Sequence, residues 1–165
     1  MKKRDPIWRA GQKAGVNMTD EKNLWEGNTV APELERFRSA QESAYETALR
    51  EIRAGRKRSH WIWFIWPQYR GLGRSAVAQY YELQSREEAA AYRKDPILGS
   101  RLVEITAELL KLEGPIEAIL RYPDNLKVRS CMTLFWLVTG ETLFKAVLDK
   151  FYDGKPDTYT VEKLK

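Results

Sequence analysis

The sequence predicts a mainly α, single-domain protein with little or no sheet, and three observations lead to that class. The chain has 165 residues, the usual size of one domain with its own core. Hydrophobic residues make up 43% of it and aromatic residues 12%, as in globular rather than disordered proteins. After Glu33, apolar residues recur mainly at three- and four-residue spacing, which is the helical period.

Two regions are expected: an N-terminal extension at residues 1–32 and a helical domain at residues 33–165. The extension mixes charged residues, glycines and asparagines without sustained apolar periodicity. This pattern is typical of a flexible segment, although Trp8 and Trp25 are unusual in one and favour docking on the rest of the protein.

The first expected helix begins at Glu33 and stops at Gly55. The apolar run His60–Trp66 fits either a buried strand or a short buried helix, because so short a run has no decisive period. Pro67 and the glycines that follow it then predict a loop. In the first helix, the residues that recur at helical spacing on one face are Leu34, Phe37, Gln41, Ala44, Tyr45, Ala48 and Ile52.

Capping residues mark the next three helix starts. Ser75 is placed to cap a helix that runs through Tyr80-Tyr81, and Ser85 stands three residues before Glu88, the capping-box spacing. Asp95-Pro96 begins a longer helix with proline in its first turn. The apolar stripe of that helix ends before Gly114-Pro115 and consists of Leu98, Leu102, Ile105, Leu109 and Leu112.

The C-terminal third predicts four more helical segments. A short helix at Ile116–Leu120 and a turn at residues 122–125 precede Leu126–Val138, which reads as a core helix with a strand as the alternative. Gly140 ends it. A further helix carries Phe144, Val147, Leu148 and Phe151, and a last short one follows Asp157.

The positive charge is local. Between Arg50 and Arg74 there are seven Lys or Arg residues and one acid, Glu51, whereas the whole chain carries a formal net charge of only +5. A local patch suits a phosphate, a nucleotide or a short stretch of nucleic acid better than a general nucleic-acid coat. Arg56–Arg58 also fits a solvated helix end, where basic side chains interact favourably with the helix dipole.

Several classes are disfavoured by composition. The single cysteine, Cys131, excludes an internal disulfide and a multi-cysteine metal site, and one histidine argues against zinc. No paired-aspartate motif suggests magnesium, so neither a metal nor another cofactor is expected. The basic start Met1–Arg4 meets Asp5-Pro6 rather than an apolar run, and no apolar stretch is long enough to span a bilayer. We therefore expect a cytoplasmic protein without a membrane partner.

The loop after Pro67 is the best candidate for a ligand site. Gly71 and Gly73 let backbone N–H groups approach an anion, Arg70 and Arg74 supply planar donors, and Ser75 opens a helix. Gln68 adds a carboxamide. The alternative is a turn whose arginines only hold acidic helix ends.

Two other groups of residues join this candidate site. His60 is a candidate general base or ligand contact, and Trp63 is a candidate stacking face within the Trp61–Trp66 run; core burial is the alternative for both. Lys127, Arg129, Ser130 and Thr133 form a second polar group at a helix start, where basic residues need a bound anion or an internal acid. We expect this group to meet the glycine loop in space.

Several blocks of the sequence occur together in one order. They are His60-Trp61-x-Trp63-Phe64-x-x-Pro67-Gln68 followed by Arg70-Gly71-Leu72-Gly73-Arg74-Ser75, and later blocks that include Asp95–Leu102, Lys127–Phe135 and Val147–Gly154. In these blocks the chain resembles the domain of unknown function 1810 family. The resemblance covers Leu34 to the C-terminus and implies a mainly helical fold without an assigned activity. The family is sometimes labelled calpastatin, a protease inhibitor. A compact, non-repetitive, aromatic composition does not fit an inhibitor that wraps its protease as a disordered chain.

These observations lead to two functional hypotheses. The first is that the chain binds, and in one version hydrolyses or modifies, a small anionic metabolite such as a nucleotide or an ADP-ribose-like compound. The second is a nucleic-acid or protein-interaction module that uses the basic helix end Arg50–Arg58. Neither an enzymatic activity nor an oligomeric state follows from the sequence.

Overall fold

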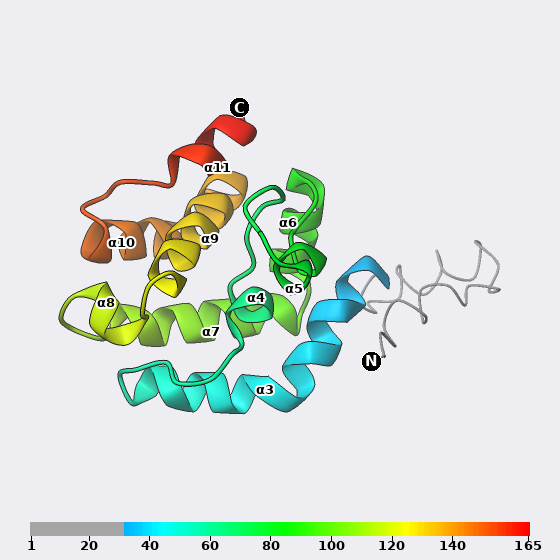
Figure 1. Ribbon diagram of the computed structural model, residues 1–165. Helices are drawn as coiled ribbons and strands as arrows, with labels where there is room; N and C mark the ends of the chain where they lie inside the picture. Colours follow the sequence, from blue (N-terminus) through cyan, green and yellow to red (C-terminus); the bar gives the residue numbers. More distant parts are fainter. Residues whose placement is uncertain (1–31) are drawn as a thin grey trace, which may run out of the picture.

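The computed structural model describes residues 32–165, which form a bundle of helices (Figure 1). A short 3₁₀ turn, η2 (Pro32–Leu34), leads into the long helix α3 (Glu35–Arg53). This part of the chain contains no strand, and one isolated bridge pairs Tyr69 with Leu83. The predicted mainly α class is confirmed. The expected extension, residues 1–32, lies outside the described residues except for Pro32.

Eight more α-helices follow α3 in the part that the structure describes. Their bounds are α4 (Ile62–Ile65), α5 (Ala76–Tyr80), α6 (Arg86–Lys94), α7 (Leu98–Leu110), α8 (Ile116–Ile119), α9 (Asp124–Thr139), α10 (Thr142–Phe151) and α11 (Thr158–Lys163). The strand alternatives for 60–66 and 126–138 are therefore wrong. With no strand beside them to pair with, both segments satisfy backbone hydrogen bonds internally as helices.

The two predicted serine caps begin their helices for the expected reason: Ser75 and Ser85 each accept a hydrogen bond from the backbone N–H three residues on. Asp157, after which a short helix was expected, caps that helix in the same way. The carboxylate of Asp95 accepts from the amides of Ile97 and Leu98 at the start of α7. Each cap supplies an acceptor that the first turn of a helix otherwise lacks.

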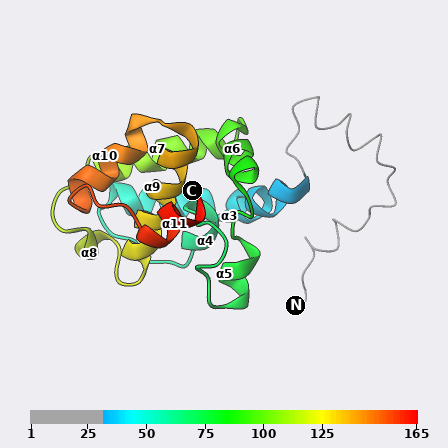
Figure 2. The same cartoon turned by 90° about the horizontal axis from the view of Figure 1, so that it is seen from above.

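Helix α7 packs against α3, α6 and α10. Figure 1 shows it between α3 below and α10 above, and Figure 2 shows it along one side of the bundle. The short α4 packs on α3 and brings the tryptophan run into the core, where Trp61 and Trp66 are fully buried. The Trp66 indole donates to the Thr106 hydroxyl at 3.0 Å, so its polar atom is satisfied inside the core. Within the described residues, no helix has both the length and the apolar character needed to cross a membrane.

Candidate functional site

One carboxylate, that of Glu51, holds the connection between α3 and α4. Its Oε1 accepts hydrogen bonds from the backbone N–H of Arg58 at 2.8 Å and of Ser59 at 3.0 Å, and from the Trp61 indole at 2.9 Å. The Ser59 hydroxyl donates to Oε2. Burial raises the pKa of Glu51, but these hydrogen bonds outweigh burial and lower the pKa to about 2. The charged carboxylate therefore fixes the backbone that carries three consecutive basic residues.

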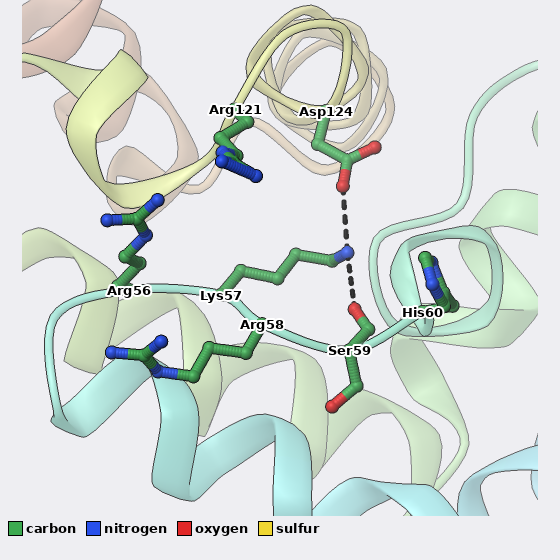
Figure 3. A pocket seen from close by; sticks show the side chains of 7 residues that line it. All are labelled: Arg56, Lys57, Arg58, Ser59, His60, Arg121 and Asp124. Carbon is green, nitrogen blue, oxygen red and sulfur yellow. Dashed lines mark hydrogen bonds and ion pairs between the residues drawn. The ribbon is translucent and has the colours of Figure 1, made fainter.

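Those basic residues line a pocket of about 350 Å³ between the α3–α4 connection and the turn from α8 to α9 (Figure 3). We call it the basic pocket. Arg56 extends toward Arg121 of the other element, whereas Arg58 extends to the opposite side of its own chain (Figure 3). Two segments distant in sequence thus bring guanidinium groups to one place. The lining residues are Arg56, Lys57, Arg58, Ser59, His60, Arg121 and Asp124.

The charges of the basic pocket are not balanced. The Asp124 carboxylate lies 2.8 Å from the Lys57 ammonium, whose side chain is only 8% exposed, and 3.7 Å from that of Lys127. Lys57 also donates to the Ser59 carbonyl at 2.6 Å. In contrast, no acidic side chain of residues 32–165 pairs with the guanidinium group of Arg56, Arg58 or Arg121. Clustered like charges repel one another, so an anion held between them would relieve the repulsion.

The amides of the glycine loop are already occupied. The backbone N–H groups of Gly71 and Gly73 donate to the two carboxylate oxygens of Glu82, which is 6% exposed. The Arg70 guanidinium donates to the Gln84 carbonyl at 3.0 Å. The glycine loop therefore surrounds a carboxylate of its own chain. The glycine pattern predicted backbone amides that bind an anion, and in the structure the group they bind is the side chain of Glu82.

The two polar groups singled out in the sequence do meet. Half of the predicted site residues line a second cavity of about 450 Å³, which we call the loop pocket. It lies between the glycine loop, the start of α5 and the first turns of α9. The predicted residues in its wall are Gln68, Gly73, Arg74, Ser75, Lys127 and Ser130. Leu72, Ala78, Tyr122, Pro123, Leu126 and Asp157 complete the wall.

The structure places Arg129 and Thr133 elsewhere. Arg129 donates to the carbonyls of Lys155 at 2.8 Å and Pro156 at 3.2 Å, and the Thr133 hydroxyl accepts from the Asp157 amide at 2.9 Å. Both residues tie the connection between α10 and α11 to α9. Lys127 tolerates its place in the first turn of α9 because Asp124 begins the helix beside it.

His60 and Trp63 lie apart from most of the loop-pocket residues. His60 is exposed at the edge of the basic pocket, and the described residues give its ring no hydrogen-bond partner. Trp63 is half-buried, and the Lys127 ammonium lies 5.6 Å from the centre of its ring. A ligand ring could stack on this face only after Lys127 moved aside.

Reasoning from the sequence missed four residues at these sites. Three of them lie in or beside the predicted turn at 122–125, to which no functional role was given: Arg121, Tyr122 and Asp124. The fourth, Glu82, was not identified as a candidate at all. The turn Arg121-Tyr122-Pro123-Asp124 could have indicated the site, because an arginine and an aromatic residue precede proline in a turn expected at the surface. No local pattern marks Glu82, because its partners are backbone amides nine and eleven residues earlier.

The comparisons with known proteins agree with the fold. The chain is similar to a conserved hypothetical protein of Mycobacterium tuberculosis, whose crystal structure superposes with a TM-score of 0.79. The two sequences are 46% identical over 80% of this chain and 96% of the other. No curated protein matches the chain. A family model described as a protein of unknown function, DUF1810, matches residues 31–164. The chain therefore belongs to the DUF1810 family, as the motifs between His60 and Gly154 indicated.

Proposed function

We propose that this protein binds a small anionic metabolite, a nucleotide or an ADP-ribose-like compound, with the phosphate group in the basic pocket. The observation that carries the proposal is the convergence of Arg56 and Arg121 from separate elements without an acidic partner among the described residues. Guanidinium groups suit phosphate because their planar donors match its oxygens. The site works in the cytoplasm, where the lone buried thiol of Cys131 stays reduced.

The pocket is built in a way that favours this use. Glu51 and Lys57 hold the backbone of the α3–α4 connection, so the arginines extend from a fixed frame. The pocket volume, about 350 Å³, lies at the lower end of the range for small-molecule sites, roughly 300–1,000 Å³. His60 stands at the edge of the pocket, where its imidazole can donate a hydrogen bond to a bound phosphate or serve as a general base.

Titration calorimetry with pyrophosphate and ADP tests the proposal. Arg56→Ala and Arg121→Ala should each weaken both ligands about tenfold to a hundredfold, because a hydrogen bond to a charged group contributes about 1.5–3 kcal/mol. Arg50→Ala is the matched control: it removes one exposed arginine of α3 that does not line the pocket, so affinity should change less than about twofold. Folded Arg56→Ala protein that binds both ligands as well as wild type would reject the proposal.

The rival function, a nucleic-acid or protein-interaction surface along Arg50–Arg58, receives less support. Arg53 lies 3.5 Å from a carboxylate oxygen of Glu108 and 3.9 Å from one of Glu104, so part of this stripe is paired with α7. Under the rival, Arg50 would be a contact residue. Arg50→Ala would then weaken binding of an oligonucleotide about as much as Arg56→Ala does.

A further inference from the structure

The basic pocket and the loop pocket border the same short segment, residues 121–127. Arg121 and Asp124 line the basic pocket, whereas Tyr122 and Lys127 line the loop pocket. Arg121 and Tyr122 are consecutive, and the Asp124 carboxylate lies 3.7 Å from the Lys127 ammonium. Consecutive Cα atoms are only about 3.8 Å apart, so the linings of the two pockets adjoin along this segment.

The loop pocket differs in chemistry from the basic pocket. One wall is apolar, and it carries two large side chains that stand open to solvent: Tyr122 is 75% exposed and Leu126 is 43% exposed. Leu72 and Ala78 line the same cavity. Neighbouring apolar groups left in water at the mouth of a cavity are typical of a binding surface. A tyrosine ring in that place offers a stacking face for another flat ring.

The polar side of the loop pocket is prepared for hydrogen bonding. The Ser130 hydroxyl, 1% exposed as a residue, lies 2.6 Å from Gln68 Oε1 and so fixes one end of that carboxamide. Within residues 32–165, the amide nitrogen of Gln68 has no hydrogen-bond partner, although the residue lines the cavity. A carboxamide held in this way can pair with the donor and acceptor edge of a heterocycle, as glutamine does with nucleobases.

We infer that the loop pocket binds the heterocyclic base of the ligand whose phosphate lies in the basic pocket. The ligand class is then nucleoside phosphates rather than inorganic phosphate or sugar phosphates. This inference rests on the proposed function. Tyr122 stacks on the base, Gln68 contacts its edge, and residues 121–127 separate the base from the phosphate.

Calorimetry with pyrophosphate, ribose 5-phosphate and ADP tests this division of the ligand. Wild type should bind ADP at least about tenfold more tightly than pyrophosphate. Tyr122→Ala should weaken ADP about fivefold to a hundredfold, the range for loss of one base–aromatic stack, and leave pyrophosphate within about twofold. Tyr122→Phe keeps the ring and should keep ADP affinity. Because Tyr122 is largely exposed, these variants should fold as wild type does.

Gln68→Leu provides a second, independent readout. It keeps the bulk of the side chain and removes the carboxamide, so it should weaken ADP but not pyrophosphate. Arg56→Ala, in contrast, should weaken both ligands equally. The difference between the two patterns separates base contacts from phosphate contacts.

The outcomes distinguish the inference from the function beneath it. If pyrophosphate and ADP bind equally well, or if Tyr122→Ala weakens both alike, the inference is rejected and phosphate binding stands. If ribose 5-phosphate equals ADP, the loop pocket holds no base and the inference also fails. If none of the three binds, the proposed function is rejected and the inference falls with it.

Discussion

The carboxylate of Glu51 receives four hydrogen bonds, from two backbone amides, one hydroxyl and one indole. All four donors lie within Arg58–Trp61, so a single side chain fixes the backbone next to the basic pocket. In the sequence, Glu51 is merely the one acid in a basic segment. Its role depends on donors seven to ten residues away, and no helical or capping pattern marks that spacing.

Glu51→Gln should therefore lower both stability and phosphate affinity. Hydrogen bonds to a charged acceptor contribute about 1.5–3 kcal/mol, so we expect a loss of about 2 kcal/mol in the free energy of unfolding by urea denaturation. Glu46→Gln is the matched control on α3, because Glu46 is exposed and the described residues give it no hydrogen bond. The control should stay within about 0.5 kcal/mol. Equal losses in both variants would contradict this role.

Glu51 also makes the stability of the fold depend on pH at the acid end. The pKa of Glu51 falls from an ordinary value of 4.5 to about 2 on folding. A carboxyl with a lowered folded-state pKa stabilises the protein fully above its unfolded pKa, and the contribution is lost as pH falls through the folded value. Wild type should thus lose this stability between about pH 4.5 and pH 2, and the difference between wild type and Glu51→Gln should shrink across that window.

Among the elements, the helices were predicted well because their signals are local. Ser75 and Ser85 cap the helices as predicted, and the short helix expected after Asp157 begins there. The two ambiguous runs, at 60–66 and 126–138, needed the tertiary structure, since apolar composition alone does not separate a buried helix from a buried strand. The glycine loop was placed correctly as a loop, but its anion proved to be the internal carboxylate of Glu82.

Tyr159 of α11 contacts this loop beside Gly71, and substitution of Gly71 tests the contact. Gly71 has φ +101°, and a Cβ there would overlap the hydroxyl of Tyr159, which donates to the Arg70 carbonyl at 3.2 Å. Gly55 has φ +93° but open space around a Cβ. Gly55→Ala should thus cost only the backbone penalty of about 1–2 kcal/mol, and Gly71→Ala should cost measurably more in thermal or urea unfolding.

Tyr159→Phe supplies the internal check on that comparison. Without the hydroxyl, the nearest ring atom would stand 3.0 Å from the new Cβ, a tight contact that a small shift relieves. The double variant Gly71→Ala with Tyr159→Phe should therefore be less destabilised than the sum of the two single variants. Additive losses would show that the loop and α11 do not press on each other.

At the scale of the whole molecule, the sequence did not predict which distant segments lie side by side. Residues 121–127 lie beside both Arg56–Arg58 and the glycine loop, and only the packing of α9 against its neighbours brings them together. The convergence of Lys127 and Ser130 with the loop was predicted because each segment showed its own polar signal. The residues of the basic pocket were divided between a helix end and a turn to which no role was assigned, so neither segment indicated a pocket.

The salt dependence of binding distinguishes a pocket from an extended basic surface. In the basic pocket, Arg56 and Arg121 converge, Arg58 extends to the other side of the same chain segment, and Lys57 is held by Asp124. A single-stranded nucleic acid bound there would place two or three of its phosphates against these arginines. The slope of the logarithm of the binding constant against the logarithm of salt concentration should then be about −1.4 to −2.1. Fluorescence anisotropy of a labelled oligonucleotide over a series of KCl concentrations gives this slope.

A slope near −4 or steeper would mean that the whole Arg50–Arg58 stripe and neighbouring cations take part. The interaction-module function would then replace metabolite binding, since the arginines of the basic pocket are too few to release that many counterions.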